Sequence, residues 1–128
     1  MFLCGARLPS LVHYTYSSVS GNYPFKSEKT ISFESTLERD FIVLMEFNPL
    51  VLDITEQPIT IEYQNLNNRK ASYTPDFKVD FLAESNIPSS YIVEVKPRKF
   101  IKSNWVKLRE KFKLATSYAK EHGYIFVF

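Results

Sequence analysis

The segments Tyr73-Thr74-Pro75-Asp76-Phe77 and Val93-Glu94-Val95-Lys96 decide the fold and the chemistry of this chain. Side chains two apart in a β-strand share a face, so a strand over 91–96 projects Glu94 and Lys96 together. Asp76 opens the run 77–81, whose alternation of apolar and polar residues predicts a second strand. If the two strands are neighbours, two carboxylates and a lysine converge, which is what a hard divalent cation and a metal-bound water require.

Length and composition bound the class of protein. The chain has 128 residues and a hydrophobic content of 45%, which predicts one folded domain. No apolar run approaches the roughly 20 residues that span a bilayer, so no membrane contact is expected. Cys4 is a single cysteine and cannot form an internal disulfide, and the N-terminus is too short for a signal peptide before Arg7 and Pro9. We therefore expect an intracellular, cytoplasmic protein.

Charge is distributed unevenly along the chain. Residues 1–95 carry seven Lys or Arg against twelve Asp or Glu, whereas residues 96–128 carry nine against two. Taken alone, such a run is more often a solvated helix face. Beside a candidate metal site, it favours a surface for a phosphate backbone. The candidates for DNA contacts are Arg98, Lys99, Lys102 and Lys107, because they follow the segment that carries Glu94 and Lys96.

The N-terminal half predicts an arm, a helix and a hairpin. Residues 1–30 show no sustained period, which predicts an irregular N-terminal arm before a domain over 31–128. A helix is expected over 34–47, capped by Ser32 or Ser35. Its inward side would carry Leu37, Phe41, Leu44, Met45 and Asn48. Strands are expected over 51–54 and 59–63, and the polar turn 65–70 predicts a hairpin between 59–63 and the strand that begins near Tyr73.

The C-terminal half predicts a strand, a helix and a strand. After the strand 91–96, an amphipathic helix is expected over 103–122, with Trp105, Leu108, Phe112, Ala115 and Ala119 facing inward. The apolar run 124–128 predicts a strand that is buried on both faces and parallel to 91–96. The order helix, three strands, helix, strand therefore predicts an α/β fold, with a mixed central sheet flanked by helices.

These residues suit metal-assisted hydrolysis of a phosphodiester. Asp76 and Glu94 are the expected ligands of a Mg²⁺ ion, with the Val95 carbonyl as a further ligand. Lys96 could orient or deprotonate the attacking water and stabilise developing negative charge. The tripeptide 94–96 alone is more often a surface pair, and only its combination with Pro75 and Asp76 is specific. Glu38, at the flank of the buried helix side, could reach the metal, or it could be a capping or solvated glutamate.

The motifs resemble those of a known family. They are Glu34-Ser35-x-Leu37-Glu38-x-Asp40-Phe41, Glu56-Gln57-Pro58, Tyr73-Thr74-Pro75-Asp76-Phe77 and Glu94-Val95-Lys96-Pro97. The layout resembles the PD-(D/E)xK nucleases of restriction-endonuclease fold. It is more closely similar to the TnsA-like endonucleases of cut-and-paste transposons, over about residues 30–128.

This resemblance implies an activity and a set of roles. Glu38, Asp76 and Glu94 would be metal-binding catalytic carboxylates, and Lys96 the catalytic lysine, in a Mg²⁺-dependent endonuclease that accepts Mn²⁺ as a substitute. The enzyme would act on double-stranded DNA and cut the 5′ ends of a transposon, beside a transposase subunit and an ATPase regulator. Glu34 and Gln57 match family positions to which we assign no role.

The resemblance leaves alternatives open. Family members commonly continue into a C-terminal domain that engages the regulator, and this sequence ends at Phe128. We therefore expect either a catalytic domain alone or a stand-alone small nuclease, for instance from a phage or a repair system. A DNA-binding scaffold without hydrolytic activity is the third alternative.

Overall fold

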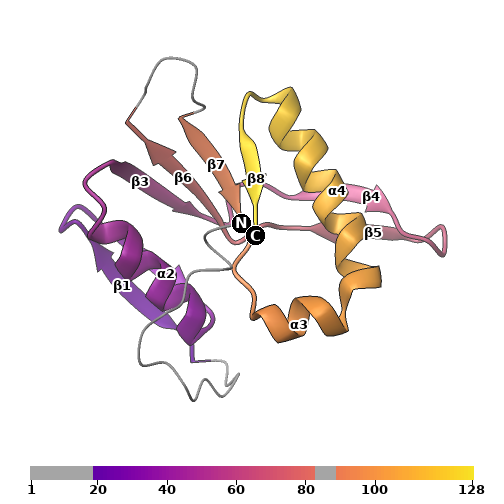
Figure 1. Cartoon of the computed structure of the whole chain (residues 1–128), viewed down its shortest axis with the longest axis horizontal. Helices are drawn as coiled ribbons and strands as arrows, with labels where there is room; N and C mark the ends of the chain where they lie inside the picture. The colour runs from indigo at the N-terminus through magenta and orange to yellow at the C-terminus, as the bar shows by residue number, and fades with distance from the viewer. Residues whose placement is uncertain (1–18, 83–88) are drawn as a thin grey trace.

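A four-stranded mixed sheet forms the centre of the fold (Figure 1). The computed structural model describes residues 19–82 and 89–128. In spatial order, its strands are β3 (Val51–Glu56), β6 (Phe77–Phe81), β7 (Ser90–Val93) and β8 (Ile125–Val127). Two strand pairs, β3 with β6 and β6 with β7, are antiparallel, and β7 pairs in parallel with β8. The expected mixed sheet and the parallel last strand are therefore confirmed.

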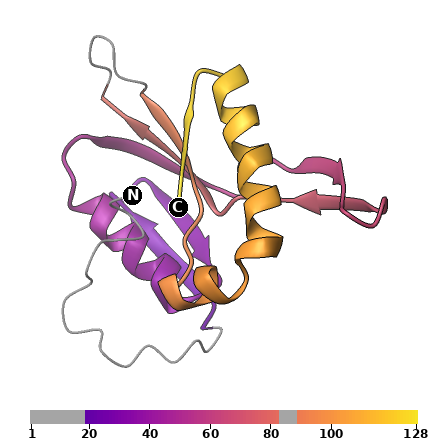
Figure 2. The same cartoon turned by 45° about the vertical axis from the view of Figure 1, so that its right-hand side comes forward.

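Helices cover both faces of this sheet (Figure 2). Helix α2 (Thr36–Glu46) lies on one face together with a hairpin of β1 (Gly21–Phe25) and β2 (Lys29–Phe33). Helix α4 (Trp105–Glu121) lies on the other face and follows the short helix α3 (Arg98–Ser103). The expected α/β class, with helices flanking a mixed sheet, is therefore correct.

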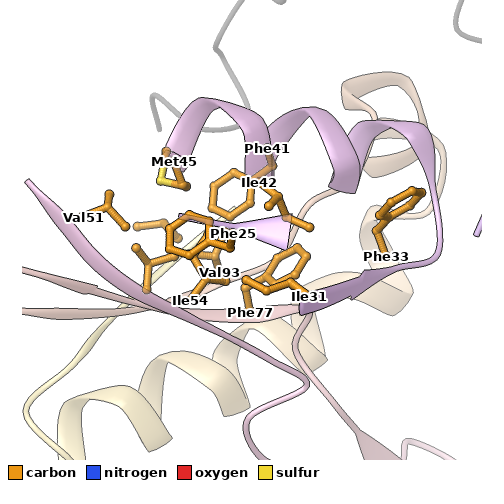
Figure 3. Packing of buried hydrophobic residues seen from close by; sticks show 12 residues of the cluster. Phe25, Ile31, Phe33, Phe41, Ile42, Met45, Val51, Ile54, Phe77 and Val93 are labelled. Atoms are coloured by element: carbon orange, nitrogen blue, oxygen red, sulfur yellow. The ribbon is translucent and has the colours of Figure 1, made fainter. Parts of the chain in front are cut away.

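The main hydrophobic core fills the space between α2, the β1–β2 hairpin and the sheet (Figure 3). The Phe41 ring of α2 stacks on the Phe77 ring of β6, with a distance of 5.3 Å between ring centroids. Ile42 and Ile54 are fully buried beside them. Because these apolar side chains leave water together, their burial supplies the main driving force for attaching α2 to the sheet.

Helix α2 begins at the residue that its capping chemistry predicts. Ser35 is the N-cap, and its side chain accepts a hydrogen bond from the Glu38 N–H at 3.1 Å. The inward side differs from the expected one, because Phe41, Ile42 and Met45 are buried, whereas Leu44 is exposed. At 100° per residue, the mean direction of 41, 42 and 45 differs from that of the expected stripe by only about 60°.

The N-terminal arm is not irregular over residues 21–30, which corrects the prediction. Residues 21–25 and 29–33 pair as an antiparallel hairpin, and Phe25, Ile31 and Phe33 join the main core. The expected domain boundary at residue 30 therefore falls inside this hairpin. Residues 1–18 of the expected arm lie outside the described residues.

The expected hairpin around the turn 65–70 is confirmed, but its second strand ends at Tyr73 instead of beginning there. Strand β4 (Ile61–Gln64) pairs with β5 (Lys70–Tyr73) in a separate two-stranded sheet. The chain leaves this sheet at Tyr73 and enters the central sheet as β6 at Phe77. The sequence 73–81 therefore contains the end of one strand and the whole of another.

The C-terminal elements correct two further expectations. Strand β8 lies at the edge of the sheet, so Ile125 is 39% exposed rather than buried on both faces. Trp105 is 44% exposed, although Leu108, Phe112, Ala115 and Ala119 are buried as expected. Its ring packs at an angle against Phe112, at the rim of the α4 face.

The stacking of Phe41 on Phe77 predicts a large loss of stability for Phe77→Ala. Phe77 is fully buried, so its truncation should lower the free energy of unfolding by about 3–5 kcal/mol. Urea unfolding followed by circular dichroism measures this change. The control Leu52→Ala, at a residue that is 54% exposed in β3, should change it by less than about 0.5 kcal/mol. Equal effects of the two substitutions would contradict this account of the core.

Candidate active site

The pairing of β6 with β7 brings Asp76 and Glu94 to the same end of the sheet. Phe77 pairs with Val93 in the antiparallel register, so Asp76, just before β6, lies opposite Glu94, just after β7. The Val95 N–H donates a hydrogen bond of 2.8 Å to Asp76 Oδ2. The structure therefore joins the two motifs that the sequence singles out. The Glu94 N–H donates to the Val127 carbonyl at 3.0 Å, which continues the pairing with β8 by one residue.

The Glu94 carboxylate is buried and held by two side chains. It is only 3% exposed. The Tyr73 hydroxyl donates to Glu94 Oε2 at 2.7 Å, and Lys96 Nζ lies 3.1 Å from Glu94 Oε1. The expected neighbourhood of Glu94 and Lys96 is therefore present. A buried carboxylate is tolerated when a cation and a hydrogen-bond donor satisfy its oxygens, as they do here.

Glu38 reaches this region from the first turn of α2. The Ser35 hydroxyl donates to Glu38 Oε2 at 2.9 Å, so this glutamate also takes part in capping its own helix. The negative charge of Glu38 acts on both Asp76 and Lys96. Glu38 therefore belongs to the same electrostatic cluster, although its hydrogen bonds are local to α2.

An open depression of about 450 Å³ adjoins Asp76. Its walls contain more acidic than basic side chains, and the Glu56 carboxylate in it accepts the Ser32 N–H at 2.5 Å. The concentration of carboxylates makes this depression attractive to cations. The lining residues are Ser32, Glu34, Glu38, Glu56, Gln57 and Asp76.

Burial and mutual repulsion shift the pKa values of Asp76 and Glu38, two of the carboxyls that line the depression. Burial, followed by the negative charge of Glu94, raises the pKa of Asp76 to about 8, against the opposing effect of the Val95 N–H bond. Burial also raises the pKa of Glu38 above its ordinary value, and the Ser35 hydrogen bond opposes this shift. In the absence of a cation, the site therefore favours a neutral Asp76.

The Lys96 ammonium is the positive counterpart of this cluster. Burial lowers the pKa of Lys96, but the negative charges of Glu94 and Asp76 outweigh that effect and raise it. Lys96 Nζ also lies 5.5 Å from the centroid of the Phe100 ring. Without a bound cation, Lys96 is therefore held in its charged form and partly balances the acids.

The oxygen ligands of this site suit a hard divalent cation, but their positions do not form a complete coordination shell. Carboxylate and carbonyl oxygens are the ligands that Mg²⁺ prefers. Within residues 19–82 and 89–128, no group of three or more His, Cys, Asp or Glu side chains is placed to hold one metal ion. The joint binding of one ion by Glu38, Asp76, Glu94 and the Val95 carbonyl therefore stays a prediction. It would require the carboxylates to reorient.

The candidate DNA-binding residues follow the site along the chain. Strand β7 ends at Val93, earlier than the expected strand 91–96, and α3 begins at Arg98, two residues after Lys96. Their side chains are all exposed, as contacts with a polyanion require. Arg98, Lys99 and Lys102 lie on α3, whereas Lys107 lies in the first turn of α4.

The sequence predicted no contact with the site's carboxylates for two residues, although both belong to motifs that it singles out. Tyr73 ends β5 with its side chain buried, and its hydroxyl reaches Glu94 across the gap between the two sheets. The alternation of β5 could have indicated that Tyr73 points inward, but not what it would meet. Ser35 was expected only as a helix cap, and its hydroxyl also binds the Glu38 carboxylate.

The raised pKa of Asp76 predicts how the stability of the metal-free protein depends on pH. Between its unfolded pKa of about 3.8 and its folded value of about 8, the folded state holds a proton that the unfolded state has lost. Stability should therefore fall as pH rises through this window, by an amount on the order of a few kcal/mol. The shift at Glu38 acts in the same direction.

Urea unfolding in EDTA, compared at about pH 5 and about pH 8, measures this dependence. Asp76→Asn removes the titrating group at nearly constant shape, so its loss of stability across the window should be less than half of the wild-type loss. A wild-type protein that gains stability toward pH 8 would contradict the assignment of a buried, proton-binding Asp76.

Comparison with known proteins gives one match. The family model described as the TnsA-like endonuclease N-terminal domain matches residues 48–128. This range includes Asp76, Glu94 and Lys96, whereas Glu38 precedes it. Comparisons with curated proteins and with solved structures found no match. No helix among the described residues has the length and apolar character of a membrane span. The family model covers more than half of the chain, and the chain therefore belongs to the TnsA-like endonuclease family.

Proposed function

We propose that this protein is a Mg²⁺-dependent DNA endonuclease that cleaves the 5′ ends of a transposon during cut-and-paste transposition. One observation carries the proposal: in a chain of an endonuclease family, Asp76, Glu94 and Lys96 converge at the paired ends of two strands. Buried acids gathered next to an open depression are typical of active sites, because ordinary structural sites avoid such repulsion.

The proposed metal ligands are the carboxylates of Glu38, Asp76 and Glu94 together with the Val95 carbonyl. Mg²⁺, or Mn²⁺ in its place, would supply an activated water and positive charge at the phosphoryl oxygens. The raised pKa of Asp76 supports this assignment, because the site lacks positive charge when it is metal-free. Tyr73 would fix one oxygen of Glu94 and leave the other to Lys96 or to the cation.

Lys96 is proposed to act on the water and on the phosphate. In its ammonium form it can donate hydrogen bonds to a phosphoryl oxygen and stabilise the negative charge that develops there. For this role, the Lys96 ammonium would exchange its contact with Glu94 for a contact with the phosphate. A role as general base requires loss of its proton, which the nearby carboxylates oppose until their charge is neutralised.

We infer that the core has the restriction-endonuclease fold. Without the two hairpins and α3, the described elements follow the order α2, β3, β6, β7, α4, β8. This order of helix, three strands, helix and strand is the one that the resemblance implies, and it positions Asp76 and Glu94 at neighbouring strand ends. The β1–β2 hairpin shares the main core, so it is proposed to belong to the same domain.

The proposed substrate is double-stranded DNA, contacted by Arg98, Lys99, Lys102 and Lys107. The transposase subunit that cuts the 3′ ends and an ATPase regulator are the proposed protein partners, and the cytoplasm, at the bacterial nucleoid or on phage DNA, is the proposed location. The exposed basic side chains of α3 support the DNA assignment because they start two residues beyond Lys96. Phosphates on either side of a scissile bond could therefore be held by adjacent parts of one segment.

Substitution of the central acid or of the lysine should abolish cleavage. Asp76→Asn and Lys96→Ala should each lower the rate of strand cleavage with Mg²⁺ by at least about 100-fold, because each removes charge that the transition state requires. Gel assays on duplex DNA measure the rate, and circular dichroism checks that the variants fold. The matched control is Asp53→Asn, at an exposed acid of β3 paired with Lys29 at 2.8 Å, which should cleave like the wild type.

Calorimetric titration with Mn²⁺ separates an enzyme from a DNA-binding scaffold of the same fold. The proposal requires ion binding by the wild type and at least about tenfold weaker binding by Asp76→Asn. Ion binding that is absent in the wild type, or cleavage that persists in Asp76→Asn, would overturn the proposed mechanism.

Loss of basic residues from α3 should weaken DNA binding and reduce its dependence on salt. Each lost phosphate contact lowers the slope of log affinity against log salt by about 0.9. Lys99→Gln with Lys102→Gln should therefore lower it by about 2, measured by fluorescence anisotropy on duplex DNA in the Asp76→Asn background. The control Lys120→Gln, in the last turn of α4, should leave the slope unchanged. A slope that does not change in the double variant would exclude α3 as the DNA surface.

A further inference from the structure

The β4–β5 hairpin projects from the body of the protein and forms no part of the central sheet (Figures 1 and 2). Its four register pairs join Ile61 to Tyr73 at the base and Gln64 to Lys70 near the tip. Ile61, Tyr63 and Ala71 are partly buried and Tyr73 is buried, whereas Glu62, Gln64 and Ser72 between them are exposed. One face of this ribbon therefore rests on the protein, and the other faces solvent.

Hydrogen bonds fix the shape of the hairpin tip. The Asn65 N–H donates to the Arg69 carbonyl at 2.9 Å, and the Asn68 N–H donates to the Asn65 carbonyl at 2.9 Å. The Asn65 side chain accepts from the N–H groups of Asn67 at 2.9 Å and Arg69 at 3.1 Å. Asn68 takes a positive φ of 57°, which asparagine tolerates. The tip is therefore a hydrogen-bonded turn that presents its side chains in a defined arrangement.

The exposed tip combines one apolar side chain with amides and positive charge. Leu66 is 75% exposed, and Arg69 and Lys70 are exposed beside it. No acidic residue occurs from Tyr63 to Pro75. Glu62 lies on the exposed face of the hairpin, and Glu110 of α4 acts on Tyr63. The tip is therefore locally basic, and its single leucine is far too small an apolar area for a specific protein interface.

The hairpin is joined directly to the candidate active site. Strand β5 ends at Tyr73, whose hydroxyl binds Glu94, and Asp76 follows three residues later. Lys111 of α4 lies over the Tyr73 ring at 5.9 Å, which adds a positive charge at the base of the hairpin. Arg69 precedes Tyr73 by four positions, so a strand rise of about 3.3 Å per residue places the tip about 13 Å from the site.

We propose that the β4–β5 hairpin is a second DNA-contacting element, which enters a groove of the duplex about four to six base pairs from the scissile phosphate. This inference rests on the proposed function. A two-stranded β-ribbon fits the major groove, and base pairs rise about 3.4 Å each, so a reach of about 13 Å or more gives this spacing. Arg69 and Lys70 contact phosphates, while Leu66 and the neighbouring amides face the base edges.

The double variant Arg69→Gln with Lys70→Gln tests this proposal, in the Asp76→Asn background that prevents cleavage. Fluorescence anisotropy on a duplex should show an affinity loss of about tenfold or more, and a salt slope reduced by about 2. Hydroxyl-radical footprinting should lose protection only at about four to six base pairs from the cut site. The matched control Glu62→Gln, on the exposed face of the same hairpin, should bind as tightly as its parent or slightly more tightly.

The possible results separate this inference from the proposed function. An unchanged affinity, slope and footprint in the double variant would overturn the hairpin proposal, while wild-type cleavage would leave the proposed function intact. Leu66→Ser provides a second reading, since it should alter the footprint at the same positions without changing the slope. A double variant that binds DNA normally but fails to join a partner protein would assign the hairpin to protein contact instead, and would also overturn the proposal.

Discussion

The antiparallel pairing of β6 with β7 is the constraint on which the candidate site depends. A slip of one residue in this register would turn one set of carboxylates to the opposite face of the sheet. Apolar burial of Phe77, Val79 and Val93 opposes such a slip. Polar contacts fix both ends of the pair, because Ser90 donates to Asp80 at 2.6 Å and the Val95 N–H donates to Asp76 at 2.8 Å. The second contact is part of the site, so the bond that holds the register also orients Asp76.

Strand periodicity was sufficient to predict the centre of the site, but not its surroundings. The alternation over 91–96 predicts that Glu94 and Lys96 lie together, and their ion pair at 3.1 Å agrees with it, although β7 itself ends at Val93. The position of Glu38 depends on how α2 is rotated on the sheet, which spacing alone determines only to within a residue or two. The role of Tyr73 depends on a contact between two separate sheets, which no local pattern encodes.

The missed elements have identifiable physical causes. The turn of the β1–β2 hairpin places Lys26 and Ser27 at positive φ without the glycine or asparagine that normally indicates such a turn. Residues 21–33 therefore gave no hairpin signal, even though they bury Phe25 and Ile31. The apolar run 124–128 indicates a strand, but composition does not show whether that strand is central or at an edge. The apolar character of this edge strand serves its packing against α4, since the Phe112 ring stacks on the Phe128 ring with a centroid distance of 4.4 Å.

The electrostatics of the site oppose the stability of the metal-free fold. Folding brings Asp76 toward Glu94 and Glu38 in a partly dehydrated place, and when all three acids are ionised the single ammonium of Lys96 cannot balance them. The fold tolerates this arrangement because the Tyr73 hydroxyl, the Ser35 hydroxyl and the Val95 N–H each satisfy one carboxylate oxygen. All three donors are neutral, so they orient the acids without removing the excess negative charge. A cation that binds the folded state alone would remove that charge and stabilise the fold through the same contacts that prepare it for chemistry. Local instability and proposed activity therefore have one origin, the confinement of more acids than the protein itself can neutralise.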